Sequence, residues 1–246
     1  MSLIPKSHPR AKSLYIREKL VHGFDDGLVA KEGLMAHGRG ETFDYLLGEK
    51  TSKYAQNAIH AAAFLLVTAT YPVISVNGNV AALCPKEIVK LAKIVNAKIE
   101  VNLFYVNEKR KKNIVNALRK AGAKEILGVD PKSSRRISGL DSARRIVDKN
   151  GIYKADVVLV PLEDGDRTIA LKKAGKKVIT FDLNPLSRTA KTADITIVDN
   201  VVRAINKLIL ECKSKKIQKI TFNNKKNLAA CVLEIKKNLS RRLSHA

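Results

Sequence analysis

The stretch Val73-Ile-Ser-Val-Asn-Gly-Asn-Val-Ala-Ala-Leu83 decides the fold, because a short run of β-branched residues ends in a polar Asn-Gly-Asn turn. Similar runs recur downstream, each followed by a helix-forming stretch. The strands predicted from these runs are residues 73–76, 99–104, 125–127, 157–160, 178–181 and 195–198. Helices are predicted at residues 85–95, 107–121, 166–174 and 201–212. This alternation is typical of an α/β fold with a mostly parallel, doubly wound sheet, so we expect a Rossmann-like, three-layer core.

The parts of the chain that flank this core are predicted to be helical. Residues 11–21, 25–35 and 52–70 are expected to form helices, with Gly23 and Gly33 as breaks, and residues 130–139 are expected to form a loop. Residues 223–243 indicate a basic amphipathic helix, which more often docks on protein than lies on a membrane. We therefore expect one domain, 1–246, with a helical N-terminal part (1–70), a Rossmann-like core (71–212) and a basic C-terminal tail and helix (213–246).

Charge is the strongest feature of the composition. The 246 residues include 46 Lys and Arg against 23 Asp and Glu, and the formal net charge of +23 attracts phosphates, acidic metabolites or nucleic acid. The basic residues are spread over most predicted helices, and the chain contains no Trp. A solvated basic surface is therefore favoured over a specific nucleic-acid site, although non-specific RNA binding is expected at low salt.

The spacing of the cysteines and the hydropathy of the chain indicate the kind of cellular compartment in which the protein occurs. Cys84, Cys212 and Cys231 lie far apart with no C-x-x-C motif, so we expect buried free thiols and neither a zinc site nor disulfides. The N-terminus has no apolar core of signal-peptide length, and no segment is apolar over the length of a membrane span. We expect a soluble, cytoplasmic protein with no membrane partner.

Polar groups follow several of the predicted strands, where ligands bind in open parallel sheets. Asn77 and Asn79 follow the first strand, but without a full G-x-G-x-x-G they are a poor dinucleotide signature. Glu163, Asp164 and Asp166 follow the fourth strand, where helix capping is slightly favoured over Mg²⁺ coordination.

The next strand ends in the richest of these groups. Asp182 could accept hydrogen bonds from a ribose or a base, while Arg188 and Thr189 open a turn suited to a phosphate. We favour nucleotide binding over a plain surface turn at this place. Asn200, after the last strand, lies near a helix N-cap and would be only a capping residue if it acted alone.

Six longer blocks stand in order along the chain. They are Ile4-Pro-Lys-Ser-His-Pro-Arg10, Ala36-His-Gly-Arg-Gly-Glu41, Val73-Ile-Ser-Val-Asn-Gly-Asn79, Glu100-Val-Asn-Leu-Phe-Tyr105, Ala155-Asp-Val-Val-Leu-Val-Pro-Leu-Glu-Asp-Gly-Asp-Arg-Thr168 and Asp182-Leu-Asn-Pro-Leu-Ser-Arg-Thr189. Together they resemble the archaeal 4-phosphopantoate:β-alanine ligase family, also called phosphopantothenate synthetase. The resemblance extends from about residue 4 to residue 206. It implies a Rossmann-like homodimer that joins 4-phosphopantoate to β-alanine with ATP and Mg²⁺, giving 4'-phosphopantothenate, AMP and diphosphate for coenzyme A synthesis.

The resemblance also implies the residues of the site. ATP would contact Arg17, Arg39, Asp182, Leu183, Asn184, Arg188, Thr189, Asn200 and Val201. The arginines among them would offset repulsion between two polyanions while the carboxylate is activated, plausibly as an acyl-adenylate. Chemical plausibility alone suggests His8, Arg10, Asn77 and Asn79 for 4-phosphopantoate; the metal ligands are not predicted.

The resemblance also suggests a role for the glycine-rich stretch between residues 35 and 48. Gly38 and Gly40 would let backbone approach the nucleotide while Arg39 reaches its phosphates, and Glu41 would begin the following helix. Arg39 and His37 are the candidate catalytic residues. His37 could bind a phosphate or move a proton, and a packing role is an equal alternative.

Two other functions remain as alternatives. A Rossmann-type oxidoreductase shares the fold but predicts a complete glycine fingerprint with an acidic residue downstream, and neither is clear in this sequence. A non-enzymatic RNA-binding protein would fit the charge, but the sequence blocks argue against it more strongly than the composition argues for it.

Overall fold

A parallel sheet forms the centre of the computed structural model, which describes residues 4–162, 164–214 and 216–243. Its five strands lie in the order β2-β1-β5-β6-β7, and every neighbouring pair is parallel. The strands are β1 (Pro72–Val76), β2 (Lys98–Val101), β5 (Val157–Leu159), β6 (Lys177–Phe181) and β7 (Ile195–Ile197). A separate antiparallel pair consists of β3 (Ser134–Arg136) and β4 (Ile146–Asp148).

Helices precede the sheet and connect its strands. The N-terminal helices are α1 (Ala11–Asp25), α2 (Lys31–Leu47) and α3 (Lys53–Thr68). The later helices are α4 (Gly78–Leu83), α5 (Pro85–Ile94), α6 (Glu108–Lys120), α7 (Gly165–Lys173), α8 (Arg188–Thr192), α9 (Val201–Cys212) and α10 (Asn224–Leu243). Short 3-10 turns occur at Pro131–Ser133 and Ala143–Arg145. The expected α/β fold with a mostly parallel sheet and a helical N-terminal elaboration is therefore confirmed.

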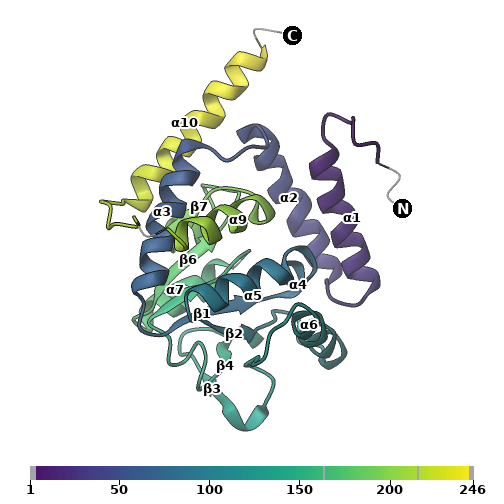
Figure 1. The fold of residues 1–246 in the computed structure, drawn as a ribbon, viewed down its shortest axis with the longest axis vertical. Coiled ribbons are helices and arrows are strands. Elements are labelled where there is room, and N and C mark those ends of the chain that lie inside the picture. The colour runs from purple at the N-terminus through teal and green to yellow at the C-terminus, as the bar shows by residue number, and fades with distance from the viewer. Residues whose placement is uncertain (1–3, 163, 215, 244–246) are drawn as a thin grey trace.

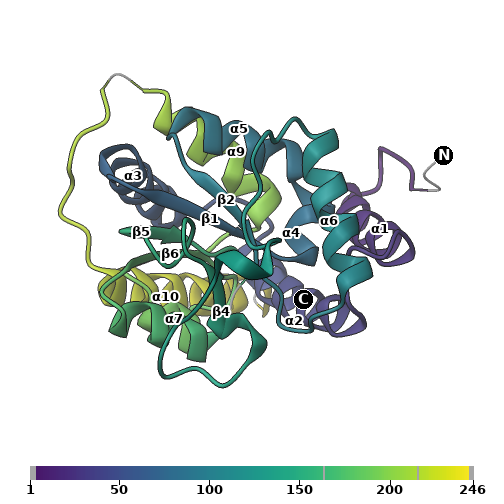
Figure 2. The same cartoon turned by 90° about the horizontal axis from the view of Figure 1, so that it is seen from below.

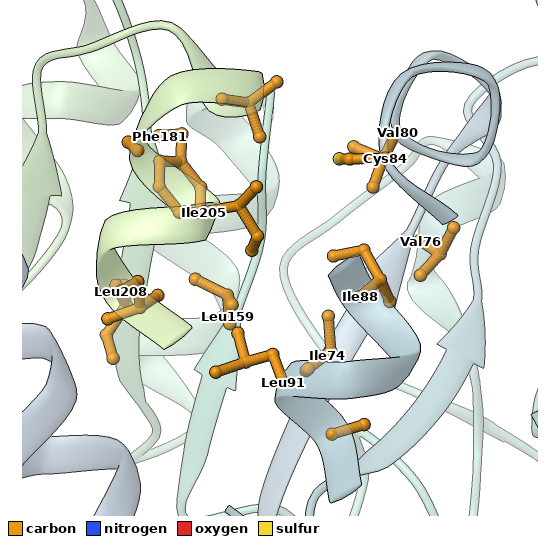
Figure 3. Close-up of a cluster of buried hydrophobic side chains, with 14 of the residues drawn as sticks. Ile74, Val76, Val80, Cys84, Ile88, Leu91, Leu159, Phe181, Ile205 and Leu208 are labelled. Atoms are coloured by element: carbon orange, nitrogen blue, oxygen red, sulfur yellow. The ribbon is translucent and has the colours of Figure 1, made fainter. Parts of the chain in front are cut away.

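The sheet is covered on both faces, which explains why its strands read as continuous apolar runs. Helices α3, α5 and α9 lie on one side of the sheet and α7 on the other (Figure 2). Alternate residues of β1 divide between the two cores, because Ile74 packs with the α5 and α9 side while Val73 packs with the α7 side. Figure 3 shows Ile74 and Leu159 of the sheet close to Leu91 of α5 and Leu208 of α9.

The strand order determines where a ligand can bind. After β1 the chain moves to one neighbour, β2, and then returns across β1 to form β5 on its other side. Connections therefore leave the carboxyl ends of β1 and β5 in opposite directions, which opens a crevice between them. Polar residues that follow the strands begin several helices: Asn77, Asp164, Ser187 and Asn200 each accept a backbone N–H with their side chains.

Two predictions about the core are wrong. Residues 125–127 do not form a strand, because only a single bridge joins Leu127 to Glu100 of β2. The predicted loop 130–139 contains β3, which pairs with β4 over the register Ser134 to Asp148. Residues 125–127 contain only two apolar residues and β3 contains none, so hydrophobic patterning does not identify either segment reliably.

The C-terminal helix α10 docks on its own chain, as its amphipathic pattern predicts. Leu228 and Cys231 pack with Leu47 of α2 and Val198 after β7, while the far end of α10 extends away from the rest of the molecule (Figure 1). The three cysteines are buried and free, which confirms the expectation from their spacing. Within the described ranges, none of the helices is long and apolar enough to cross a bilayer.

Candidate active site

A large cavity lies at the carboxyl edge of the sheet. Its volume is about 1080 Å³, and its lining includes residues that follow four neighbouring strands, β2, β1, β5 and β6. One face of α2 forms another wall. Ligand pockets typically enclose roughly 300–1,000 Å³, so this cavity has room for a nucleotide together with a small acid. It also lies at the switch point of the strand order, where ligands of open α/β sheets bind.

The glycine-rich stretch forms part of α2, and this corrects two predictions. Gly33 does not end a helix and Glu41 does not begin one, because α2 runs without a break from Lys31 to Leu47. Glycine weakens an isolated helix by about 1 kcal/mol relative to alanine, but tertiary packing provides most helix stability in proteins. The predicted break at Gly23 is wrong for the same reason, since α1 continues to Asp25.

Close backbone packing explains two glycines near the cavity. A Cβ atom on Gly33 would collide with the side-chain oxygen of Asn79, and a Cβ atom on Gly78 would collide with the carbonyl oxygen of Leu28. The amide of Asn79 donates to the carbonyl of Gly33 at 2.8 Å. These contacts hold α2 and the segment before it against α4, and so fix the width of the cavity.

Two predicted substrate residues line the cavity but also hold the framework together. Asn77 donates from its side-chain nitrogen to the carbonyls of Pro161 and Leu162, both at 3.1 Å, and its side-chain oxygen accepts from the N–H of Val80. Asn77 therefore links the ends of β1 and β5. Asn79 links α4 to α2 in the same way.

The loop after β6 brings the predicted nucleotide residues into the cavity. Asp182, Leu183 and Asn184 line it, and the Asp182 carboxylate accepts from the Ser187 hydroxyl and, at 2.9 Å, from the N–H of Asn184. Burial raises the pKa of Asp182, against the opposing effects of these hydrogen bonds and of the nearby positive charge of Arg39. The acceptor is thus rigidly held before any ligand arrives.

Two arginines from different helices line the cavity. Arg39 reaches it from α2 and Arg188 from the start of α8. Arg188 is 68% exposed and pairs with the equally exposed Asp166 at 2.5 Å. Exposed ion pairs contribute little free energy, so Arg188 can exchange this partner for a phosphate. Thr189 also lines the cavity and is buried.

His37 lies on the cavity face of α2 one turn before Glu41. Burial lowers the pKa of His37, and Arg17 lowers it further, whereas the charge of Glu41 raises it. The imidazole is therefore neutral at neutral pH. A neutral imidazole can accept a proton, which makes His37 a suitable base.

Three predicted residues lie beside α2, in α1 and the segment before it, and do not line the cavity. Arg17 donates to Glu41 at 2.8 Å, and Arg10 donates to Glu49 at 2.8 Å and to Glu41 at 3.2 Å. His8 accepts from the backbone N–H of Arg10 at 3.0 Å. The structure thus gathers these groups around two carboxylates of α2 and its C-terminal end, next to His37 but outside the cavity wall.

Asn200 and Val201 are buried at the end of β7 and also lie outside the cavity lining. The side chain of Asn200 accepts from the N–H of Val202 at 3.0 Å, as its predicted capping role requires. The neighbouring Asp199 accepts from Thr51 at 2.7 Å and pairs with Arg203, which also pairs with Asp44 of α2. This network ties the end of β7 to α2.

Sequence reasoning missed the cavity wall at the β2 end. Phe104 and Tyr105 follow β2, and Arg110 comes from the first turn of α6. The rule about strand ends could have found these three residues. Arg144 could not have been found in this way, because it belongs to the segment between β3 and β4.

The acidic group after β5 is a helix cap. Asp164 accepts from the N–H of Arg167 at 2.8 Å and from the side chain of Arg144 at 3.2 Å, which bears out the capping interpretation. Glu163 lies outside the described residues. Among the residues that the structure describes, no group of three or more His, Cys, Asp or Glu side chains could hold a metal ion.

Comparison with known proteins adds an independent finding. The family model for phosphopantothenate/pantothenate synthetase matches residues 54–238. A protein of Thermococcus kodakarensis named 4-phosphopantoate–β-alanine ligase is 54% identical, over 97% of this chain and 94% of its own. A protein of the same name from Thermococcus onnurineus is 60% identical, over 83% of this chain and 78% of its own. Another of that name, from Methanosarcina mazei, is 49% identical, over 97% of this chain and 96% of its own.

Proposed function

This chain belongs to the phosphopantothenate/pantothenate synthetase family, and from that premise we propose that it is a ligase that joins 4-phosphopantoate to β-alanine with ATP. The products would be 4'-phosphopantothenate, AMP and diphosphate, and the reaction serves coenzyme A synthesis. The observation that carries this function is the family match over residues 54–238, because those residues build every strand that borders the cavity. It favours a ligase over an oxidoreductase or an RNA-binding protein.

We place ATP at the β6 end of the cavity. Arg39, Arg188 and Thr189 offer donors to phosphates, and Asp182 with Asn184 offers fixed acceptors and donors to the nucleoside. Leu183 packs beneath α2, 3.6 Å from the position of a Cβ atom on Gly40.

Three further residues that lie outside the cavity lining would also contact the nucleotide. Asn200 and Val201 follow β7, which is the next strand to β6 in the sheet. Arg17 of α1 lies outside the cavity lining but close enough for its charge to act on His37. All three would contact ATP if the bound nucleotide extends beyond the cavity lining.

The reaction proceeds through an acyl-adenylate in this account. A carboxylate oxygen of 4-phosphopantoate attacks the α-phosphorus, and the bond from that phosphorus to the diphosphate breaks. The nitrogen of β-alanine then attacks the acyl carbon, AMP leaves with the bridging oxygen, and the nitrogen loses a proton. Arg39 and Arg188 stabilise the negative charge that develops on the phosphates.

His37 is the base that takes a proton from the β-alanine ammonium group. Its lowered pKa keeps the imidazole in the accepting form at neutral pH, and its side chain lines the cavity. The packing alternative predicts no effect of His37 on the pH dependence of the reaction, so the two roles are separable.

Mg²⁺ would enter the site with ATP. This ion usually keeps several waters and binds through substrate phosphates plus one or two carboxylates. Asp182 is a carboxylate of the cavity lining in the loop after β6, and it would hold the ion. The ion would supply positive charge to the diphosphate leaving group.

The resemblance to the family also suggests an oligomeric state and a cellular location. We propose a homodimer, and the exposed apolar side chains of α10 support it, since Leu233 is 65% and Leu239 42% exposed. Light scattering after size exclusion measures the oligomeric state. We also place the enzyme in the cytoplasm, where ATP is available.

A reconstituted reaction tests the function. The pure protein is incubated with ATP, Mg²⁺, 4-phosphopantoate and β-alanine, and AMP and 4'-phosphopantothenate are followed by mass spectrometry. We expect both products in equal amounts and only when every component is present. A folded, ATP-binding protein that makes no product would contradict the proposal.

Isotope transfer tests the intermediate. With ¹⁸O in the carboxylate of 4-phosphopantoate, an acyl-adenylate delivers one labelled oxygen to AMP. Label in inorganic phosphate, together with ADP in place of AMP, would show an acyl phosphate and would reject the adenylate while keeping the ligase.

A further inference from the structure

The proposed position of ATP leaves the β2 end of the cavity unused. Phe104 and Tyr105 line this end from the β2–α6 connection, Arg110 from the first turn of α6, and Arg144 from the segment before β4. Between this end and the loop after β6 lie the ends of β1 and β5. Neighbouring strands are about 4.8 Å apart, so three strand steps separate the two ends of the cavity by roughly 14 Å.

The positive charge of Arg110 is not neutralised by its hydrogen bond to the backbone. Its guanidinium donates to the backbone carbonyl of Tyr105, which is a neutral acceptor. Among the described residues, Arg110 makes no ion pair. A guanidinium has five N–H donors in a planar fork, so further donors remain for an anion.

Arg144 is held in a fixed orientation in the cavity lining. Its side chain is 8% exposed, it donates to Asp164 at 3.2 Å, and its guanidinium carbon lies 5.9 Å from the centre of the Phe104 ring. Asn102, at the end of β2, donates to the carbonyl of Arg144 at 3.4 Å and to that of Ile146 at 2.9 Å. Two elements therefore position the Arg144 fork before any ligand binds.

Part of the cavity wall is apolar. Leu28, Leu103 and Phe104 all line the cavity. Under the proposed function, 4-phosphopantoate has a carboxylate at one end, a phosphate monoester at the other and two methyl groups between them. Its carboxylate must meet the α-phosphate of ATP, so its own phosphate must point away from the β6 end.

Resting on the proposed function, we propose that Arg110 and Arg144 bind the phosphate of 4-phosphopantoate at the β2 end of the cavity. The methyl groups lie against the apolar wall, and the carboxylate faces the nucleotide. Arg110 is then the residue that distinguishes 4-phosphopantoate from unphosphorylated pantoate. This role is separate from that of Arg39 and Arg188, which serve the phosphates of ATP.

Steady-state kinetics of Arg110→Ala tests the assignment. Hydrogen bonds to charged groups contribute about 1.5–3 kcal/mol, which corresponds to a rise of about 10- to 100-fold in the KM for 4-phosphopantoate. The KM for ATP stays within about twofold. The preference for 4-phosphopantoate over pantoate falls by the same factor, and Arg110→Lys recovers part of it.

Lys112→Ala is the matched control, because it removes one exposed positive charge from the same helix and Lys112 does not line the cavity. The control keeps wild-type kinetics, and circular dichroism verifies that both variants fold. The inference is overturned if Arg110→Ala keeps the wild-type KM for 4-phosphopantoate, or if its KM for ATP rises equally. A wild-type protein that forms no 4'-phosphopantothenate would instead reject the proposed function, so the two failures are distinguishable.

Discussion

His37 combines a position on the cavity wall with a pKa that burial lowers. As the proposed base it must be neutral, so the wild-type kcat falls when the pH drops below the lowered pKa of His37. We expect His37→Gln to lower kcat by about 10²–10⁴-fold and to remove this acidic limb, while the KM for ATP changes little. The measurement is kcat between pH 5 and 9.

A packing role for His37 gives a different pattern. His37→Gln would then lower thermal stability and leave the shape of the pH profile unchanged. Arg39→Ala provides the comparison, because it is expected to raise the KM for ATP and to retain the acidic limb.

Gly38 occupies an exposed position in the middle of α2, and nothing lies within 4 Å of the place where its Cβ would be. Replacement by alanine should raise the free energy of unfolding by about 0.5–1 kcal/mol, because glycine is a poor helix former. If the nucleotide approaches this backbone, the same variant raises the KM for ATP. Urea unfolding and kinetics measure the two effects.

The reverse substitution Ala36→Gly, also exposed on α2, is the stability control and should lower the free energy of unfolding by a similar amount. A loss of stability in Gly38→Ala would contradict the account of α2. It would indicate contacts to Gly38 that the isolated chain does not contain.

At the residue scale, the sequence allowed good predictions for polar and charged side chains that directly follow a strand. Asp182, Arg188 and Thr189 were expected after a strand, and the structure places all three on the cavity. Arg17 was expected near ATP by resemblance and Arg10 near 4-phosphopantoate by chemical plausibility, yet their carboxylate partners Glu41 and Glu49 could not be foreseen. Those pairs depend on how α1 packs against α2, and no local pattern encodes that packing. Their roles in binding stay predictions.

The contact of α4 with the segment before α2 is the clearest test at the scale of elements. A Cβ atom on Gly78 would collide with the Leu28 carbonyl, and both groups are backbone. We expect Gly78→Ala to lower the free energy of unfolding by about 1–3 kcal/mol and to reduce kcat/KM, because Asn77 and Asn79 move with it. Gly38→Ala, the same change in open space, serves as the control. Unchanged stability of Gly78→Ala would show that this contact is not tight.

Long elements were predicted better than short ones. The five strands of the sheet were expected because buried parallel strands are continuous apolar runs. The helices α5, α6, α7 and α9 were also expected, whereas α4 was not. The helix α2 was missed because its three glycines, at positions 33, 38 and 40, suggest breaks, whereas packing against α1, α4 and the loop after β6 stabilises the helix. The pairing of β3 with β4 was missed because β3 (Ser134–Arg136) contains no apolar residue, so no hydrophobic pattern marks it as a strand.

A buried carboxyl group links the stability of the whole molecule to pH. Glu100 of β2 is fully buried and accepts from the backbone N–H groups of Asp148 at 3.1 Å and Ile152 at 2.7 Å. Burial raises the pKa of Glu100 from 4.5 to about 7, although these hydrogen bonds and the charge of Arg167 oppose the rise. The folded state therefore binds this proton more tightly than the unfolded state does.

The sign of the pH effect follows from linkage. The contribution of Glu100 to stability is complete below about pH 4.5 and is lost as the pH rises through about 7. We expect Glu100→Gln to flatten this part of the unfolding free-energy profile, measured by urea denaturation at several pH values. Glu125→Gln, at a mostly exposed side chain, should leave the slope as in the wild type. An unchanged slope in Glu100→Gln would contradict the raised pKa.

At the scale of the whole molecule, the sequence predicted the architecture and the family, but not the cavity. Its two ends combine groups from α2, from four strand ends and from the β3–β4 segment, which only the assembled fold brings together. The net charge of +23 is a property of the entire surface, and composition alone could not assign it to substrate binding. The expectation of one domain, 1–246, stays a prediction.

A crystal structure with a non-hydrolysable ATP analogue and 4-phosphopantoate tests the central claim most directly. The account predicts one cavity with both ligands in it, the triphosphate hydrogen-bonded to Arg39 and Arg188 and the phosphate of 4-phosphopantoate at Arg110. A nucleotide bound outside this cavity, or away from the loop after β6, would contradict it.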